Sequence, residues 1–393
     1  MRDAYIVSSV RTPGCRRTKG AFKDTRPEDL LSFIMQAALE KAGSLEPKAI
    51  DDVMIGCSFP EAEQGLNIGR LATQIAGFPV TVSGATVNRF CSSGLEAIAL
   101  ASLRVMAGWS EVTMGGGVES MTYVPMGGNL PRPHPEHARV HADLYASMGI
   151  TAENVANRYK VSREDQDAFA YESQMKAARA QKEGLFTEIV PTPAARFVLQ
   201  ESGTYKRETF LQDFDDGVRA TTTKEGLAKL RAVFAANGSV TAGNSSQTTD
   251  GAAASIIASG DAVKKYGFKP IARLKMYTTV GCEPDEMGVG PAVAIPKLLA
   301  MAGLKPSDIG LWEINEAFAS QALYCIRTIG IEDRMDSINI HGGAIALGHP
   351  LGCTGAKLCA TLLANMQRKG VQYGVESMCI GGGMGAAALF ELC

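Results

Sequence analysis

The sequence predicts an α/β protein in which one β-α pattern occurs twice. Apolar strand signals alternate with helical spacing through the first third of the chain. A second set of strands and helices follows from about residue 270 to the C-terminus. In each set a strand is expected to end in three glycines, at residues 115–117 and 381–383, so the two sets echo each other.

The first set begins close to the N-terminus. Residues 4–10 have the character of a strand, and residues 53–56 and 112–114 have that of short buried strands. Helical spacing covers residues 29–42 and 94–107. The second of these helices is apolar nearly all round, which is typical of a helix buried on several sides. We therefore expect it at the centre of the molecule.

The middle of the chain, residues 120–249, differs from both sets. It is richer in charge and in amphipathic helix signals. Ser162 is a candidate N-cap with Asp165 in the capping-box position, and Gly184 is placed to close that helix. We interpret this stretch as an inserted loop domain. Beyond it, residues 355–366 predict a helix of the second set.

Composition is that of a soluble enzyme. The 393 residues are 46% hydrophobic and 20% charged, enough for a large core divided into two or three domains. A net charge of -2 gives no electrostatic reason to expect nucleic acid or an acidic membrane surface as a partner. The longest apolar stretches, such as residues 98–106, are too short to span a membrane.

Cysteine usage and the N-terminus suggest a compartment. The nine cysteines have no C-x-x-C spacing, and their odd number argues against a secreted disulfide framework. Because the first strand starts at residue 4, no cleavable leader is expected. Reduced thiols and a cytoplasmic location are therefore predicted.

One cysteine lies where a nucleophile is favoured. Residues 87–97, VNRFCSSGLEA, place Cys91 at the start of the central helix. Unpaired N–H groups and the helix dipole stabilise a thiolate there, and such sites lower a thiol pKa to roughly 3.5–7.5. From this segment alone, a small buried apolar residue is an equally good interpretation of Cys91.

Three later segments carry polar groups where a core would not favour them: residues 315–319, 341–350 and 379–385. Taken singly, His349 would more often be a structural histidine and Asn315 a cap or surface residue. Together with the Cys91 block, the segments resemble the motifs of the thiolase family in order and spacing. The similarity covers essentially the whole chain.

The resemblance implies a thiolase fold. Two similar β-α halves would be related by a pseudo-twofold axis and stacked in five layers (αβαβα), with the inserted loop domain covering coenzyme A (CoA). The corresponding boundaries are residues 1–119, completed by 250–271, for the N-terminal half, 120–249 for the loop domain and 272–393 for the C-terminal half.

The resemblance also implies an acyltransferase with assigned roles. Cys91 would be acylated, His349 would accept its proton, and Asn315 would hold a water that completes an oxyanion pocket. A second pocket would consist of the backbone N–H groups of Cys91 and Gly381. Cys379 would protonate the acetyl-CoA carbanion, since a thiol pKa lies near the operating pH.

CoA and acyl-CoA are expected as substrates, with no permanently bound cofactor. By resemblance, Arg219 would contact the nucleotide and Ser246 the pantetheine. The tunnel between them would be lined by Phe234, Met148, Ala317 and Phe318.

Two other motifs lack the context that they need. The glycines at 381–385 resemble a dinucleotide fingerprint, yet too few residues follow to build a β-α-β unit. His134, His137 and His141 have a spacing that a metal could use, but they lie among prolines and charges, which favours a solvated loop. No metal is expected.

The sequence contains features of both short-chain biosynthetic and degradative thiolases, which differ in substrate range. Gly226 and Ser147 stand where short-chain biosynthetic thiolases commonly have serine and histidine, whereas residues 61–67 and 124–128 resemble degradative thiolases. We therefore favour a 3-ketoacyl-CoA thiolase of fatty acid β-oxidation. The alternatives are a biosynthetic acetyl-CoA acetyltransferase and an inactive acyl-CoA binding protein. Oligomeric thiolases suggest a homodimer or homotetramer, with a β-oxidation complex as a further partner.

Two residues leave questions open. Glu316 either orients the site through hydrogen bonds or only braces the turn at Asn315. His341 stands where the family usually has asparagine, and it could add a titrating group near the site.

Overall fold

A computed structural model describes residues 2–393. Its main sheet has the strand order β10-β11-β12-β9-β1-β8-β5-β3-β4, with β2 paired to β8. The strands of this sheet are β1 (Ala4–Arg11), β2 (Cys15–Arg16), β3 (Asp52–Gly56), β4 (Ser83–Val87), β5 (Val112–Ser120), β8 (Thr249–Ser259), β9 (Ala272–Gly281), β10 (Leu311–Ile314), β11 (Tyr373–Ile380) and β12 (Met384–Leu392).

The two halves of this sheet have the same topology. In the N-terminal half β3 is parallel to β5, β5 is antiparallel to β8, and β8 is antiparallel to β1. In the C-terminal half β10 is parallel to β11, β11 is antiparallel to β12, and β12 is antiparallel to β9. The halves join where Tyr5 and Ile6 of β1 pair with Arg273 and Ala272 of β9.

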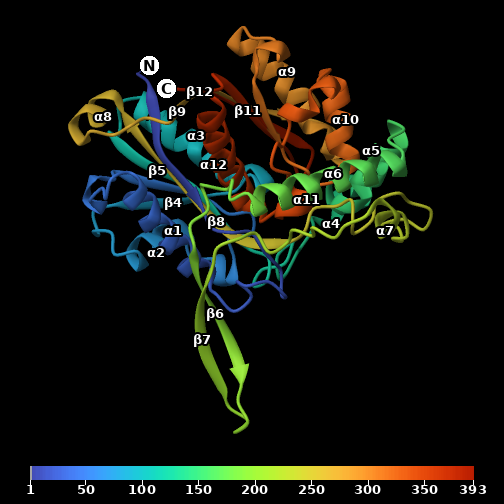
Figure 1. Cartoon of the computed structure of the whole chain (residues 1–393), viewed down its shortest axis with the longest axis horizontal. Helices are drawn as coiled ribbons and strands as arrows, with labels where there is room; N and C mark the ends of the chain where they lie inside the picture. The colour runs from blue at the N-terminus through green and yellow to red at the C-terminus, as the bar shows by residue number, and fades with distance from the viewer. Residues whose placement is uncertain (1) are drawn as a thin grey trace.

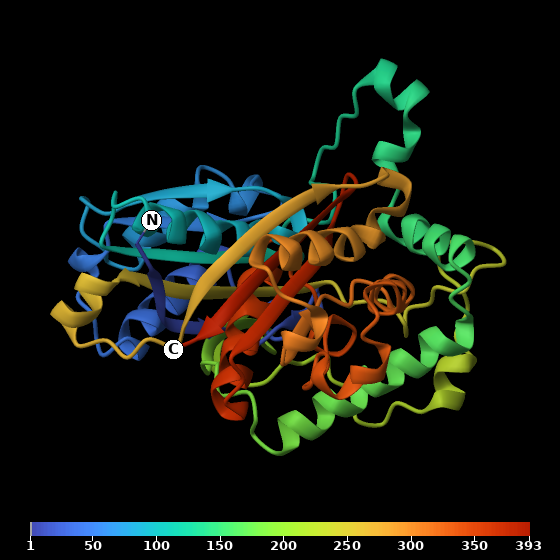
Figure 2. The ribbon, with the colours of Figure 1, turned by 90° about the horizontal axis from the view of Figure 1, so that it is seen from above.

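Helices cover both halves and separate them, which gives the five expected layers (Figures 1 and 2). One core lies between the first outer helices and the N-terminal strands, a second surrounds α3 and α12, and a third lies under α9 and α10. The helices of these layers are α1 (Pro27–Lys41), α2 (Ile68–Ile75), α3 (Ser93–Met106), α8 (Gly260–Tyr266), α9 (Gly290–Ala302), α10 (Ala319–Ile329), α11 (Ala344–Leu347) and α12 (Leu351–Lys369).

The central helices α3 and α12 touch through glycines. A Cβ atom on Gly94 would lie 2.7 Å from the backbone nitrogen of Ala356, and one on Gly355 would lie 2.4 Å from that of Leu95. Only glycine allows this approach. It brings the N-terminal ends of both helices to the middle of the molecule.

The prediction that each half contains a strand ending in three glycines is correct for the C-terminal half and wrong for the N-terminal half. Gly381, Gly382 and Gly383 do follow the end of β11, but residues 115–117 lie inside β5. There, Cβ atoms on Gly115 and Gly117 would clash with Ile98 of α3 and Gly352 of α12. These glycines therefore admit the central helices rather than end a strand.

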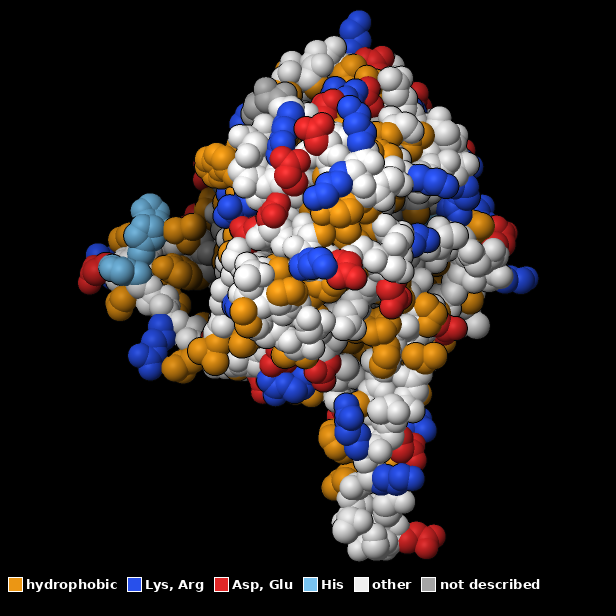
Figure 3. Space-filling model, turned by 90° about the vertical axis from the view of Figure 1, so that its left-hand side faces the viewer, with side chains coloured by type: hydrophobic (Ala, Val, Ile, Leu, Met, Phe, Trp, Pro, Cys, Tyr) orange, Lys and Arg blue, Asp and Glu red, His pale blue; other side chains and the backbone are white. Residues whose placement is uncertain are grey.

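The segment between the halves contains helices and a projecting hairpin. Ser162 caps α6, its hydroxyl accepting from the backbone N–H of Asp165, and Gly184 follows the helix with φ 64°, as expected. The β6–β7 hairpin extends away from the body as an arm (Figures 1 and 3). The elements are α4 (Pro135–Val140), α5 (Met148–Arg158), α6 (Arg163–Lys182), α7 (Lys224–Ala228), β6 (Thr192–Leu199) and β7 (Tyr205–Gln212).

None of the helices in residues 2–393 combines the length and apolarity needed to cross a bilayer.

Candidate active site

The candidate nucleophile Cys91 lies in a 3-10 turn, Phe90–Ser92, immediately before α3. Phe90 has φ 42°, a backbone conformation that costs a non-glycine residue of order 1–3 kcal/mol. Asn88 holds this turn, because its Oδ1 accepts from the backbone N–H of Phe90 at 2.8 Å. The Cys91 side chain is 5% exposed and packs against Met121 and Leu351.

The expected lowering of the Cys91 pKa is wrong. Burial raises the pKa to about 12, although the backbone N–H groups of Gly381 and of Cys91 itself act in the opposite direction. Desolvation of the thiolate outweighs the helix start because the sulfur is covered on all sides. Cys91 is therefore a thiol at pH 7, and its reaction as a nucleophile would require a base.

His349, the candidate for that base, is a buried histidine just before α12. Its Nδ1 lies 2.6 Å from Oγ1 of Thr354, and its Nε2 lies 3.4 Å from Nδ2 of Asn315. Burial and the positive charge of Lys357 lower its pKa to about 3, so the ring is neutral at pH 7. Because Nδ2 of Asn315 can only donate, its contact with Nε2 assigns this ring nitrogen as the unprotonated one and Nδ1 as the one that donates to Thr354.

Asn315 is completely buried beside this ring. Its Oδ1 has no hydrogen-bond partner among the residues that the structure describes. A buried amide oxygen without a partner is unfavourable by roughly 1–3 kcal/mol, which a bound water would relieve. The geometry is compatible with the water-holding role expected for Asn315.

The second thiol, Cys379, lies near the end of β11 and is fully buried. Burial and the negative charge of a Cys91 thiolate raise its pKa well above the ordinary value. It belongs to an apolar cluster that contains Met148, Phe234, Ala317 and Phe318, the four residues expected in the tunnel. The rings of Phe234 and Phe318 meet edge to face at 6.1 Å.

A cavity of about 250 Å³ is lined by His349 and by residues that pack against the two thiols: Met121 and Leu351 beside Cys91, and Met148, Phe234 and Phe318 beside Cys379. Ser246 is on its wall, held by a 2.9 Å bond from its backbone N–H to the carbonyl of Ala317. Gly381 lies beside it, since a Cβ there would be 3.7 Å from the sulfur of Met148. The other predicted residues on the wall are Met148, Phe234, Phe318 and His349, and the further ones include Met121, Met126, Ser147 and Leu351.

Arg219 is not part of this cavity. Its side chain is exposed and lines a separate, open cavity of about 490 Å³ with Thr221, Thr222 and Thr223. Its backbone N–H donates to Gln174 at 2.8 Å, which fixes the loop but leaves the guanidinium at the surface.

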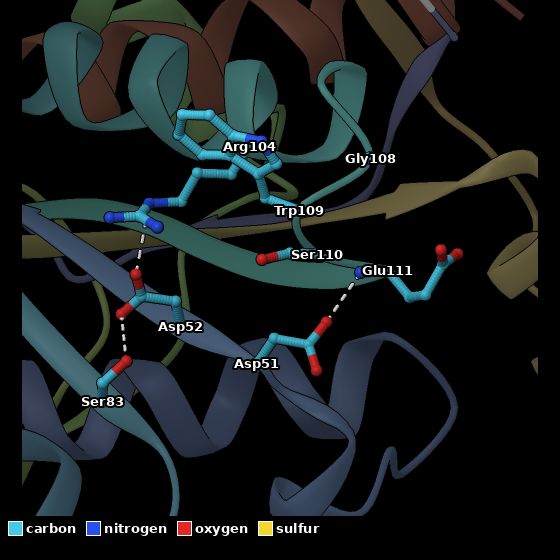
Figure 4. A pocket seen from close by; sticks show the side chains of 8 residues that line it. All are labelled: Asp51, Asp52, Ser83, Arg104, Gly108, Trp109, Ser110 and Glu111. Carbon is cyan, nitrogen blue, oxygen red and sulfur yellow. Dashed lines mark hydrogen bonds and ion pairs between the residues drawn. The ribbon is translucent and has the colours of Figure 1, made fainter.

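A third cavity, about 450 Å³, has none of the predicted site residues on its wall (Figure 4). Its carboxylates already have partners. Asp52 lies 3.2 Å from Arg104 and accepts from Ser83 at 2.7 Å, while Asp51 accepts from the backbone N–H of Glu111 at 2.6 Å.

Glu316 orients the site rather than bracing one turn. Its carboxylate accepts from Ser173 at 2.6 Å, from Asn339 at 2.8 Å and from the backbone N–H of Ile345 at 3.3 Å. These bonds tie α6 to the segment that leads to His349.

His341 is 4% exposed and does not line the cavity. A guanidinium nitrogen of Arg368 lies 3.1 Å from its Nε2, and Phe186 meets the ring edge to face. Burial and nearby cations, Arg368 first, lower its pKa to about 4. His341 is therefore a neutral packing residue at pH 7.

The three spaced histidines are exposed, on or beside α4, which replaces the expected loop with a short helix. His134 acts as its N-cap, accepting from the backbone N–H of His137. Across residues 2–393, no group of three His, Cys, Asp or Glu side chains is arranged to hold a metal ion.

Two residues near the site went unpredicted. Thr354 contacts Nδ1 of His349, and the positive charge of Lys357 adds to burial in lowering the pKa of that ring. Their signal is visible in retrospect: together with Thr361 and Asn365 they form a polar stripe at helical spacing in the otherwise apolar, buried α12.

Comparison with known proteins identifies the family of the chain. Residues 4–261 match the model of the thiolase N-terminal domain, and residues 268–392 match that of the thiolase C-terminal domain. A 3-ketoacyl-CoA thiolase of Bacillus subtilis is 48% identical over 100% of both chains. The peroxisomal 3-ketoacyl-CoA thiolase of Homo sapiens is 46% identical over 99% of this chain and 91% of its own.

Solved structures give the same result. Human mitochondrial 3-ketoacyl-CoA thiolase superposes with a TM-score of 0.88 at 36% identity, covering 100% of this chain and 99% of its own. An acetyl-CoA acetyltransferase of Bacillus anthracis gives 0.89 at 35% identity with the same coverage. The expected fold is confirmed, and the chain belongs to the thiolase family of acyltransferases.

Proposed function

We propose that this protein is a 3-ketoacyl-CoA thiolase (acetyl-CoA C-acyltransferase), which uses CoA to cleave 3-ketoacyl-CoA into acetyl-CoA and a shortened acyl-CoA in fatty acid β-oxidation. The observation that carries the proposal is the pair of buried thiols, Cys91 and Cys379, beside one cavity that contains neutral His349. Full-length identity of 46–48% to 3-ketoacyl-CoA thiolases supports it.

In the first half-reaction the sulfur of Cys91 attacks the keto carbon, and His349 Nε2 takes the thiol proton. The water on Asn315 and the protonated His349 then stabilise the oxyanion. Collapse of this intermediate breaks the carbon–carbon bond and leaves an acyl thioester on Cys91. The departing acetyl-CoA carbanion takes its proton from Cys379, which becomes a thiolate.

In the second half-reaction the Cys379 thiolate takes the thiol proton of CoA. The CoA sulfur attacks the acyl thioester, and its oxyanion is held by the backbone N–H groups of Cys91 and Gly381. Release of the shortened acyl-CoA returns Cys91 as a thiolate, which recovers the proton held by His349. Every group ends as it began.

CoA and acyl-CoA serve as substrates, and the chain needs no permanently bound cofactor for these steps. Arg219 would meet the nucleotide end, since its guanidinium is exposed beside an open cavity. Ser246 would meet the pantetheine within the cavity that reaches His349.

The two segments that resemble degradative enzymes lie against each other. The carboxylate of Glu61 accepts from the backbone N–H of Asn129, and Gly128 packs on the same carboxylate. The segment from the N-terminal half thus meets the segment from the loop domain, and the resemblance of both to degradative thiolases favours the β-oxidation role over the biosynthetic one.

Thiolysis rates across substrates of four to sixteen carbons test the assignment. A kcat/KM that holds or rises beyond four carbons is expected. Activity confined to acetoacetyl-CoA would instead identify a biosynthetic acetyl-CoA acetyltransferase, and no cleavage at any length would identify an acyl-CoA binding protein.

Variants of the two cysteines distinguish the roles proposed for their thiols. Cys91→Ala should form no acyl-enzyme, whereas Cys379→Ala should acylate at Cys91 yet fail to exchange the methyl protons of acetyl-CoA with solvent. Mass spectrometry of the acyl-enzyme and NMR of the exchange measure the two steps. Unchanged turnover in Cys379→Ala would refute the acid assigned here.

A cytoplasmic location and a homo-oligomer, with a β-oxidation complex as partner, belong to the same proposal. All nine cysteines are among the described residues and form no disulfide there, which fits a reducing compartment.

A further inference from the structure

A buried carboxylate outside the catalytic set lies between the segments that carry the nucleophile and the base. Glu119, near the end of β5, is fully buried. Its Oε2 accepts from the backbone N–H groups of Ser58 at 2.7 Å and Gly352 at 2.8 Å, and its Oε1 accepts from Nε2 of Gln64 at 2.8 Å. An ionised carboxylate has acceptor sites for all these donors.

On the side of the base, Gly352 follows His349 by three residues and is the second residue of α12. Its N–H is one of those at the helix N-terminus, where a negative charge is favoured. A Cβ at this position would lie 2.5 Å from the backbone nitrogen of Ser58 and 2.7 Å from Glu119. Glycine is therefore required for the contact.

On the side of the nucleophile, hydrogen bonds continue from Ser58 to the turn at Cys91. The carbonyl of Ser58 accepts from Nδ2 of Asn88 at 2.9 Å, and Oδ1 of Asn88 accepts from the backbone N–H of Phe90 at 2.8 Å. Phe90 is the left-handed residue immediately before Cys91. Glu119 thus connects to both reacting side chains without touching either.

We propose that Glu119 is a positioning residue that fixes the distance between the sulfur of Cys91 and the ring of His349 during acyl transfer. The inference rests on the proposed function, because it requires proton transfer between these two groups. Proton transfer and attack depend steeply on geometry, and a displacement of 1 Å can slow a reaction about 100-fold. A buried carboxylate with donors on three segments resists such displacement better than apolar packing does.

Glu119→Gln tests the inference because it keeps the shape and replaces one acceptor oxygen with a donor. With its oxygen on the N–H groups of Ser58 and Gly352, the new amide sets its NH2 group against Nε2 of Gln64, which loses this acceptor, and the neutral oxygen accepts more weakly than a carboxylate. We expect Cys91 to acylate at least tenfold more slowly in a single turnover, with KM for the acyl-CoA within twofold of the wild type.

Glu376→Gln is the matched control. Glu376 is another fully buried glutamate, on β11, and neither of its carboxylate oxygens has a hydrogen-bond partner among the described residues. The Glu376→Gln variant should acylate Cys91 at a rate within twofold of the wild type. This comparison distinguishes the loss of positioning from the general effect of replacing a buried carboxyl group.

Exchanging the two side chains provides a rescue. In Gln64→Glu/Glu119→Gln the amide of residue 119 can donate to the new carboxylate, and its oxygen can still accept from Ser58 and Gly352. We expect this double variant to recover most of the lost acylation rate, which is a coupling that independent packing defects would not show.

The measured acylation rates either support or overturn the inference. Acylation of Glu119→Gln within twofold of the wild type would overturn the inference alone. A wild type that does not acylate would overturn the proposed function, and the inference with it. Should Glu119→Gln not fold, Asn88→Ala breaks the same connection at an exposed position; at least fivefold slower acylation would support the inference, and an unchanged rate would overturn it.

Discussion

At the scale of single residues, burial sets the chemistry of the site. The sequence places Cys91 at a helix start, and this position is correct. It does not reveal how many side chains cover the sulfur, so the direction of the pKa shift could not be predicted. The same holds for Thr354, whose contact with His349 depends on how α12 begins. The spacing of motifs identifies reacting groups, whereas their protonation depends on packing.

The rate of Cys91 acylation should be nearly constant from pH 5 to pH 9. The pKa of His349 is lowered to about 3 and that of Cys91 is raised to about 12, so both groups stay neutral across this range. Single-turnover rapid-quench measurements would test this. A rise in rate with a midpoint near pH 6.5 would show that His349 titrates like an exposed histidine.

His341 should make folding sensitive to acid. Its pKa is lowered to about 4 in the folded chain and is near 6.5 when unfolded, so the unfolded chain binds more protons between these values. Stability from this group is present above pH 6.5 and is lost as the pH falls toward 4. His341→Asn should therefore lose less stability than the wild type between pH 7 and pH 5, by on the order of 1 kcal/mol. Urea unfolding at both values measures the difference, and equal losses would contradict it.

At the scale of elements, the sequence predicts helices and strands well where they are long and apolar. The helices expected at 29–42 and 94–107 occur as α1 and α3, each shifted by one or two residues. The prediction that a strand ends at residues 115–117 was wrong, because glycine in a strand can mark either a turn or the close approach of another segment, and the sequence does not distinguish the two. The β6–β7 arm was not foreseen, since an exposed hairpin leaves no core pattern.

The glycine contact between the central helices should be intolerant of one methyl group. Gly355→Ala places a Cβ 2.4 Å from the backbone nitrogen of Leu95, so we expect a loss of about 2 kcal/mol or more in the free energy of unfolding. Urea denaturation would measure it. Gly260→Ala is the control, because the nearest atom there, in Tyr5, is 3.7 Å away; it should be neutral or stabilising by up to about 1 kcal/mol. Equal effects of the two changes would contradict the close packing.

At the scale of the whole molecule, the resemblance of four short blocks was sufficient for the fold. Their order fixes which half supplies each group. In the structure His349 lines the cavity and Asn315 lies beside His349, while Cys91, Gly381 and Cys379 lie against residues of the cavity wall. Contacts to CoA are harder to predict, because they come from loops. Arg219 illustrates this, since its side chain is at the surface and outside that cavity.

The particle in solution should be at least a homodimer. β4 is the last strand of the sheet and pairs only with β3 among the described residues, so one edge of β4 is open to another chain. Light scattering should therefore give a mass of at least twice the 41.6 kDa of one chain. A monomer at micromolar concentration would contradict this expectation.

The matching topology of the two halves has a consequence for how such a site could arise. α3 and α12 hold equivalent places in their halves, and Cys91 precedes one while His349 precedes the other. Two units of one topology, when joined in a single chain, can each change without the other. One copy could specialise in bond formation and the other in moving protons, a division of labour that identical subunits of a symmetric dimer cannot achieve.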